Sequence, residues 1–230
     1  MSLKTLKQRL RRYNLQRKGV EVVRCETKRC YGGPVFGWVL DPSLLSIESI
    51  VYSVGVGSNV DFDLALVDSF GLTVHAFDPT PRSIDWVKQQ DLPENFVFHE
   101  LGLAAFDGEI DFYPPAKSTS SHFSPVNRYG HQSGQVERIR APVRRLESIA
   151  RDLGHGHIDL LKMDIEGGEY EVLEDLLATA IPIRQLLIEF HHMFKTIGLQ
   201  QTLDAIENLK HAGFALIHIS ERSYEFSFRR

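Results

Sequence analysis

The chain has 230 residues, with 26 Lys and Arg against 30 Asp and Glu, which gives a formal net charge of −4. Hydrophobic residues make up 43% of the chain and charged residues 24%. These values exclude a collagen-like or mostly disordered protein and are typical of a globular chain that buries a core. No run approaches the ~20 apolar residues that cross a bilayer, and the first residues lack the apolar run of a signal peptide. We therefore expect a cytoplasmic protein.

Positive charge is concentrated at the N-terminus. Residues 1–30 carry ten Lys or Arg and two Glu, a net charge of +8, which leaves −12 on residues 31–230. We expect a basic helical arm over the first range and one large domain over the second. The arm has three leucines at helical spacing: Leu3, Leu6 and Leu10. Residues 1–18 either contact an anionic or peripheral membrane surface or pack these leucines on the domain. The acidic remainder argues against an extended nucleic-acid groove.

From residue 50 onward, short β-branched runs alternate with helical stretches. Strands are expected at 50–54, 72–77, 96–99, 109–113, 158–163, 184–190, 214–219 and 224–228. Helices are expected at 60–70, after Pro81, and at 169–177 and 200–211. Residues 114–135 are rich in Pro, Ser and Gly and predict a long loop. The alternation is typical of an α/β fold with a parallel sheet covered on both faces and an antiparallel strand at its end.

A glycine turn follows the first of these strands. Gly55, Val56 and Gly57 allow backbone to approach a ligand, and the N–H groups of the next helix favour a negative group there. Asp78 lies at the end of the next strand and 21 residues after Gly57. A carboxylate in this place accepts hydrogen bonds from a ribose diol, so the pattern predicts an adenosine-containing cofactor. A dinucleotide fingerprint has Gly or Ala where Val60 stands, which disfavours nicotinamide and flavin cofactors.

Acidic and imidazole side chains follow two later strands. Asp164 and Glu166 come after the strand at 158–163, and His191 and His192 after the next one. Because sequential strands are often neighbours, we expect both pairs at one end of the sheet as catalytic candidates. Such a cluster either binds a divalent ion or uses a histidine as base without metal, and we assign no metal ligand. Structural roles compete: the carboxylates can serve the next helix N-terminus, and one of two adjacent histidines must point away.

Four segments resemble the FkbM-type S-adenosylmethionine-dependent methyltransferases. They are residues 51–57, 75–81, 162–170 and 188–192. The third segment is the most specific, because glycine turns like the first occur in many cofactor-binding folds. The resemblance runs from about Tyr31 to the C-terminus. It implies a Rossmann-like class I methyltransferase fold, with a mostly parallel seven-stranded sheet, helices on both faces and a C-terminal antiparallel hairpin.

The resemblance also implies a set of site residues. The cofactor is expected to be S-adenosylmethionine, with the glycine turn at its methionine part. Related enzymes carry an acid where Ser53 stands, and we expect Asp61 to compensate for its absence. Cofactor contacts are expected from Gly55, Val56, Gly57, Asp61, Asp78, Pro79, Gly102 and Leu103, the last two near adenine. Acceptor contacts are expected from His122 and Glu169.

The expected activity is methyl transfer to a hydroxyl of a small molecule or glycan, where the oxygen acceptor is implied by the resemblance. Two alternatives are an NAD(P)-dependent oxidoreductase and a non-catalytic adenosine-binding adaptor whose basic arm meets an anionic surface. The sequence has no G-x-S-x-G elbow, no G-x-x-x-x-G-K-[ST] loop and no cysteine cluster, which disfavours hydrolase, nucleotide triphosphatase and radical chemistry. The two cysteines, Cys25 and Cys30, are too few for a disulfide framework.

Overall fold

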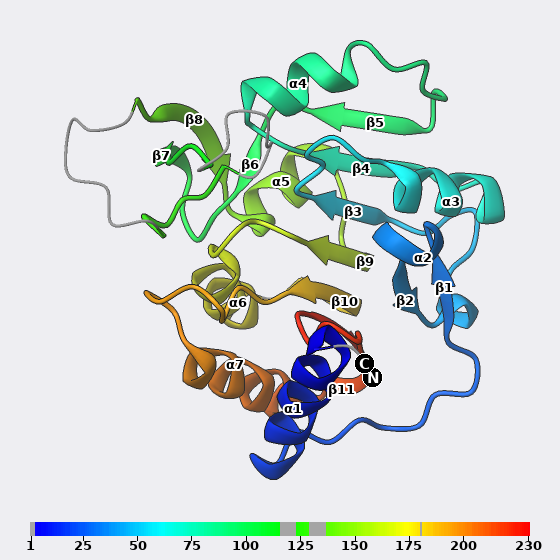
Figure 1. The fold of residues 1–230 in the computed structure, drawn as a ribbon. Helices are drawn as coiled ribbons and strands as arrows, with labels where there is room; N and C mark the ends of the chain where they lie inside the picture. Colours follow the sequence, from blue (N-terminus) through cyan, green and yellow to red (C-terminus); the bar gives the residue numbers. More distant parts are fainter. Residues whose placement is uncertain (1–2, 116–122, 129–136, 180) are drawn as a thin grey trace.

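A central seven-stranded sheet organises the chain, with the strand order β11-β12-β10-β9-β3-β4-β5 (Figure 1). A computed structural model describes residues 3–115, 123–128, 137–179 and 181–230. The strands are β3 Val51–Val54, β4 Val74–Phe77, β5 Phe96–His99, β9 Ile158–Met163, β10 Ile183–Glu189, β11 Ala215–Ile219 and β12 Glu225–Arg229. β12 runs antiparallel to both β10 and β11, and the pairs among β10, β9, β3, β4 and β5 are parallel. The expected closing hairpin is confirmed, and its last strand lies between β10 and β11.

Helices cover both faces of this sheet, as the α/β prediction requires. They are α1 Leu3–Arg17, α2 Gly33–Phe36, α3 Asp61–Phe70, α4 Pro81–Val87, α5 Leu146–Leu153, α6 Glu169–Ala178 and α7 Leu199–His211. α4 starts with a proline in its first turn, where the missing N–H has no partner to lose. Leu160 of β9 packs in the core cluster with α3 and α4, while Leu161 packs in the cluster with α5, α6 and α7. Successive strand side chains point to opposite faces, so one strand serves two cores.

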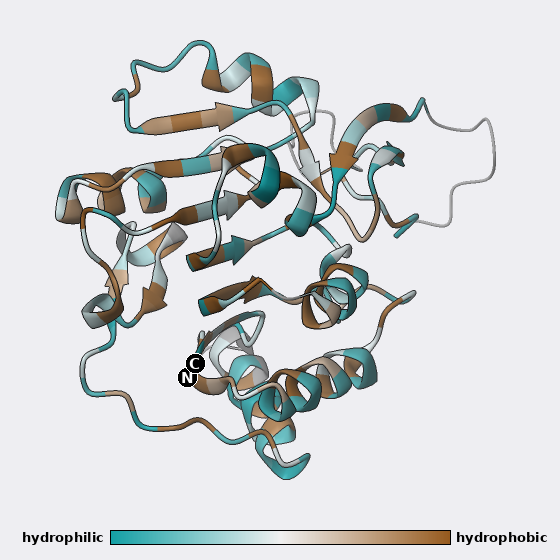
Figure 2. Cartoon of the chain, turned by 180° about the vertical axis from the view of Figure 1, so that it is seen from behind, coloured by the Kyte–Doolittle hydropathy of each residue, from teal (hydrophilic) through white to brown (hydrophobic). Residues whose placement is uncertain are grey.

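The innermost strands are buried on both faces. All six residues of β9 are buried, and such strands read as nearly continuous apolar runs. Figure 2 shows mainly hydrophobic residues even along the edge strand β5, whereas α7 alternates hydrophilic and hydrophobic segments. Lys162 is the cation in β9, so its burial calls for a specific set of partners.

Two smaller sheets flank the central one and were not expected. One contains β6 Gly102–Leu103, β8 Ile139–Arg144 and β7 Gly108–Phe112, in the order β6-β8-β7. The other pairs β1 Arg29–Tyr31 with β2 Trp38–Leu40, before the 3-10 turn Pro42–Leu44. β7 is the edge strand that the sequence predicts at 109–113. Most of the expected loop at 114–135 lies outside the described residues, but Tyr113 forms a bridge with Ser124.

The basic arm joins the domain through residues other than the expected ones. Leu15 and Val20 are buried in the core cluster that contains α7 and β11, whereas Leu6 and Leu10 are exposed. The alternative in which the spaced leucines pack on the domain is therefore wrong for Leu6 and Leu10. None of the helices in the described part of the chain combines the length and apolar character that a bilayer span requires.

A substitution at Gly55 tests the close packing after β3 and β9. Gly55 has φ of +85°, and a Cβ there would overlap the backbone carbonyl oxygen of Asp164. We expect Gly55→Ala to lower the free energy of unfolding by about 1–3 kcal/mol, because a backbone atom cannot move away cheaply. Urea unfolding measures this change. Gly156→Ala is the matched control, since a Cβ there meets open space, and equal stability of the two variants would contradict the packing.

Candidate functional site

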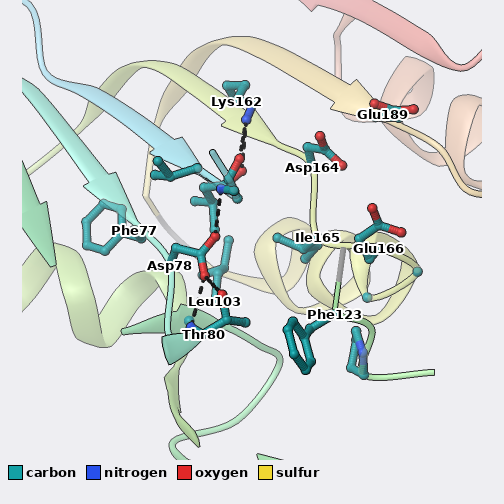
Figure 3. A pocket seen from close by; sticks show the side chains of 18 of the residues that line it. Phe77, Asp78, Thr80, Leu103, Phe123, Lys162, Asp164, Ile165, Glu166 and Glu189 are labelled. Carbon is teal, nitrogen blue, oxygen red and sulfur yellow. Dashed lines mark hydrogen bonds between the residues drawn. The ribbon is translucent and has the colours of Figure 1, made fainter. Parts of the chain in front are cut away.

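A cavity of about 620 Å³ opens at the carboxyl ends of β3, β4, β9 and β10 (Figure 3). This volume lies in the range of small-molecule sites, roughly 300–1,000 Å³. Parallel α/β sheets bind ligands at this end, where loops from neighbouring strands converge. The expected cofactor residues that line it are Gly55, Val56, Gly57, Asp78, Pro79, Gly102 and Leu103. Val35, Gly37 and Trp38 line it from the segment before the core.

Asp78 joins the glycine turn to the end of β4. One of its carboxylate oxygens accepts the Gly57 N–H at 3.0 Å. The other accepts from the N–H and the hydroxyl of Thr80, at 2.9 and 2.6 Å. The carboxylate is thus fixed in position while it lines the cavity (Figure 3). A carboxylate has about four acceptor sites, so further hydrogen bonds from a ligand remain available.

An apolar wall stands next to Asp78. Leu103 and Phe123 line the cavity, Leu103 beside Thr80 and Phe123 below Ile165 in Figure 3. Gly102 packs so closely against Pro79 that a Cβ would come within 2.9 Å of the proline Cγ. This contact places the short strand β6 against the end of β4. The wall can accept a flat apolar group beside the carboxylate.

Asp63 takes the place that the sequence assigns to Asp61. Asp61 is exposed, accepts a hydrogen bond from Asn59 at 2.9 Å and is absent from the cavity lining. Asp63 is buried and lines the cavity. Its Oδ1 and the Ser53 hydroxyl have no hydrogen-bond partner among the described residues. Burial raises the pKa of Asp63, and the Lys162 ammonium opposes that shift. In the sequence, the spacing of Asp63 from Leu66 and Val67 places it on the same helix face as these apolar residues.

Lys162 stabilises the glycine turn through hydrogen bonds to its backbone. Its ammonium donates to the carbonyl oxygens of Gly55 at 2.7 Å and Val54 at 3.4 Å, and it lies 5.8 Å from the centre of the Trp38 ring. A buried ammonium needs such acceptors to offset its lost hydration. In the sequence, Lys162 belongs to the segment 162–170 that resembles the family. A lysine within a mostly apolar strand also indicates a buried cation with specific partners.

His191 links the carboxylates that follow β9. Its Nδ1 lies 2.8 Å from Oε1 of Glu169. Its Nε2 lies 3.8 Å from Asp164 and 3.6 Å from Glu166. Burial lowers the pKa of His191, but the charges and hydrogen bond of these carboxylates, Glu169 first, raise it to about 10 overall. The ring therefore carries a proton on both nitrogens at neutral pH.

Glu169 is fully buried and does not line the cavity. Besides His191, its Oε1 accepts the backbone N–H groups of Ile165 at 3.1 Å and Gly167 at 3.2 Å. It therefore shapes the loop between β9 and α6. Glu169 thus stabilises the loop that lines the cavity without lining the cavity itself. A direct contact between Glu169 and the acceptor stays a prediction, which this placement does not favour.

Glu166 connects this loop to residues 123–128. It has φ of +53°, in the left-handed region that non-glycine residues enter rarely and often at functional sites. Its carboxylate pairs with Arg128 at 2.5 Å, and its carbonyl oxygen accepts the Ser124 hydroxyl at 2.6 Å. Glu166 and Asp164 both line the cavity (Figure 3). The expected juxtaposition of the two strand ends is therefore present.

Glu189, the last residue of β10, is an acid that the sequence analysis left out of the site. It lines the cavity on the same side as Asp164 (Figure 3). Burial raises the pKa of Glu189 to about 7, with the Asp164 charge adding to the rise. Arg222 opposes this shift from 3.4 Å. Burial also raises the pKa of Asp164. The cavity thus holds carboxyl groups that titrate closer to neutral pH than usual.

No histidine candidate that the structure describes lines the cavity: His191 is absent from the lining and contacts two carboxylates that do line it. His192 is absent from the cavity lining, and its ring packs against Tyr224 with centres 5.3 Å apart. Burial lowers the pKa of His192 to about 4, with a contribution from Arg11. As expected for adjacent residues, one histidine points away from the other. His122 lies outside the described residues.

Asp164, Glu166 and His191 offer ligand atoms within 4.8 Å of one another. Two carboxylates and an imidazole held at its other nitrogen by an acid form a donor set that suits divalent ions. An ion there would have to displace the proton of His191 and compete with Arg128 for Glu166. The residues can hold a metal. Without one, Glu166 pairs with Arg128 and His191 pairs with Glu169.

Comparison with known proteins gives the same picture. Residues 53–216 match the family model for the methyltransferase FkbM domain. "Probable methyltransferase-like protein 24" of Homo sapiens is 30% identical over 144 residues, 61% of this chain and 32% of that protein. The Rattus norvegicus protein of the same name is 28% identical over 179 residues, 73% of this chain and 42% of its own length. The chain therefore spans less than half the length of these two relatives.

Two bacterial proteins are also similar. The "31-O-demethyl-FK506 methyltransferase FkbM" of Streptomyces tacrolimicus is 26% identical over 201 residues, 73% of each chain. The crystal structure of methyltransferase FkbM from Methylobacillus flagellatus KT superposes with a TM-score of 0.49 at 15% identity, over 89% of this chain and 49% of that one. The central sheet is mostly parallel, and its last strand in chain order, β12, runs antiparallel between β10 and β11. Since the family model covers the chain from β3 to β11, including the glycine turn and the carboxylates after β9, the protein belongs to the FkbM methyltransferase family.

Proposed function

We propose that this protein transfers a methyl group from S-adenosylmethionine to a hydroxyl oxygen of a small molecule or glycan. The observation that carries the proposal is the Asp78 carboxylate, fixed by the Gly57 N–H at 3.0 Å on the wall of a cavity of about 620 Å³. The name of the Streptomyces relative describes an oxygen methyltransferase, which supports a hydroxyl acceptor.

The residues of the cavity fit S-adenosylmethionine from end to end. Asp78 would accept hydrogen bonds from the ribose hydroxyls, and the wall of Leu103 and Phe123 would contact adenine. Asp63, whose Oδ1 lacks a partner among the described residues, would accept the ammonium of the methionine part. The raised pKa of Asp63 would then fall, because an opposite charge favours the carboxylate. When bound, the cofactor supplies an electrophilic methyl group on a sulfonium sulfur.

The acceptor would be activated at the other end of the cavity. Methyl transfer to oxygen requires a base that removes the hydroxyl proton, and a base works best with a pKa near the working pH. Asp164 lies beside Gly55 of the glycine turn, and Glu189, with a pKa of about 7, lies on the same wall. In this proposal Asp164 removes the proton from the acceptor hydroxyl and passes it on to Glu189. His191 is protonated and holds Asp164 and Glu166 in place as a positioning residue.

Binding of the cofactor tests the role of Asp78. We expect Asp78→Ala to weaken the binding of S-adenosylhomocysteine by about 1–3 kcal/mol, because the ribose hydroxyls lose a charged acceptor. Isothermal titration calorimetry measures the affinity. Asp61→Ala is the matched control, since the exposed side chain of Asp61 accepts a hydrogen bond from Asn59 and does not line the cavity. Absence of binding to the folded wild-type chain, or equal loss in both variants, would contradict the assignment.

Replacement of Asp164 tests the base. We expect Asp164→Asn to lower the transfer rate by about 10²–10⁴-fold, because the amide cannot take the proton. The measurement is transfer of a labelled methyl group into a panel of polyhydroxylated macrolides and oligosaccharides. Affinity for S-adenosylhomocysteine should stay within about twofold, since the amide conserves shape.

Chelation distinguishes this base from a metal-activated acceptor. We expect dialysis against EDTA to leave the transfer rate unchanged, because Glu166 and Glu169 already form ion pairs with Arg128 and His191. Loss of activity that Mg²⁺ or Mn²⁺ restores would instead assign Asp164, Glu166 and His191 to a metal, with a lowered hydroxyl pKa as the mechanism.

The raised pKa of Glu189 has a consequence for stability. The folded chain holds this proton up to pH about 7, whereas an unfolded carboxyl releases it at pH about 4.3. Stability therefore falls as pH rises between these two values. We expect Glu189→Gln to stabilise the chain at pH 8 by up to roughly 3 kcal/mol relative to its effect at pH 4. Urea unfolding at both pH values measures this, with the exposed Glu48→Gln as control; a difference independent of pH would contradict the shift.

A further inference from the structure

We propose that the outward face of α1 docks this chain on an anionic lipid bilayer. The surface consists of Leu6, Leu10 and Tyr13 together with the cations beside them. It is independent of the cavity and of the proposed methyl transfer. The inference starts from the way in which α1 packs on the domain.

α1 buries one side and exposes apolar residues on the other. Leu15 is 2% exposed and packs in the domain core. Leu6, Leu10 and Tyr13 are 41%, 57% and 58% exposed. At about 100° per residue these three share one face, which points away from the face of Leu15. The exposed stripe is therefore not the edge of a buried contact.

The helix that carries this stripe is strongly basic. The helix carries six Lys or Arg and no acid: Lys4, Lys7, Arg9, Arg11, Arg12 and Arg17. The rest of the chain beyond residue 30 is strongly acidic, so the cationic surface is local. Val22 and Val23, in the segment after the helix, are also exposed. Apolar side chains inserted between lipids, with Lys and Arg at anionic headgroups, are the two signals that hold amphipathic helices at a membrane.

The same charge could attract a nucleic acid, but the apolar stripe decides between the two partners. Phosphate backbones pair with cations and would leave Leu6 and Leu10 in water. A bilayer surface accommodates both groups, since burial of each methylene between lipids is favourable and the headgroups pair with the cations. The observations therefore favour lipid.

α1 is attached to the domain at a turn that also reaches the cavity. Arg11 donates to the carbonyl oxygen of Arg222 at 3.4 Å, and its guanidinium lies 4.8 Å from the centre of the Tyr224 ring. The side chain of Arg222 lines the cavity. The docking helix and the cavity thus share the turn between β11 and β12, and α1 lies beside this edge of the sheet (Figure 1).

Vesicle sedimentation of the full chain tests the proposal. We expect binding to vesicles of phosphatidylcholine with about 30% phosphatidylserine, weaker binding to phosphatidylcholine alone, and loss of binding as NaCl screens the headgroups. The double variant Leu6→Glu with Leu10→Glu should bind at least about tenfold more weakly, because it replaces the inserted side chains by anions. Both positions are exposed, so the variant should unfold in urea as the wild-type chain does.

The matched control is Ile47→Glu, which adds the same charge at an apolar side chain 69% exposed elsewhere on the domain. Its binding should equal that of the wild-type chain. Three outcomes overturn the proposal: no binding to the anionic vesicles, equal binding by the double variant, or equal loss in the control. Binding to poly(uridine) that the double variant retains, without vesicle binding, would assign the arm to nucleic acid instead.

Discussion

One buried carboxylate determines the form of the charged wall. Glu169 is fully buried, and an ionised acid in that position is costly unless it is paired and hydrogen-bonded. One of its oxygens, Oε1, meets this requirement with two backbone N–H groups of the loop after β9 and with the His191 ring, while Oε2 has no hydrogen-bond partner among the described residues. The loop therefore cannot change shape without exposing the charge of Glu169. His191 is in turn held where its second nitrogen faces Asp164 and Glu166, so the wall depends on a residue that does not line the cavity.

The cavity has two chemically different ends, and this division limits which ligands fit. Leu103 and Phe123 form an apolar wall beside Asp78, whereas Asp164 and Glu189 form a charged wall with raised carboxyl pKa values. A ligand that suits both ends carries a flat apolar group, a diol and a cationic part in that order. Repulsion among neighbouring carboxylates is relieved when a cation lies between them. The proposed sulfonium cofactor has these groups in this order, while a dinucleotide would place a pyrophosphate near the acids.

The elements that the sequence predicts are those whose signal is local. β3, β9, β10 and the helices after them have strong apolar periodicity, and the glycine turn with Asp78 follows from chain order alone. β6 and β8 have no such signal: β6 has two residues, and β8 contains Pro142 and alternating arginines. Asp63, Lys162 and Glu189 became site residues through packing. The elements that carry them also hold other charged residues, and only the folded chain shows which of these face the cavity. The sequence does not distinguish Asp63 from Asp61, because the side of α3 that is buried depends on the exact residue at which the helix starts.

Ion pairs at the rim of the cavity fix two segments: residues 123–128 and the turn between β11 and β12. Arg128 and Ser124 hold Glu166 in its left-handed conformation from residues 123–128. Arg222 reaches Glu189 and Glu225 from the turn that α1 supports. Arg128 and Arg222 each pair with a carboxylate that lines the cavity. A ligand that changes the charge of those carboxylates therefore also changes the strength of the ion pairs that fix the two segments. In the proposed reaction, recognition of the acceptor would therefore be coupled to the conformation of these loops through the same ion pairs. Acceptor specificity would then lie in the rim and cofactor specificity in the sheet.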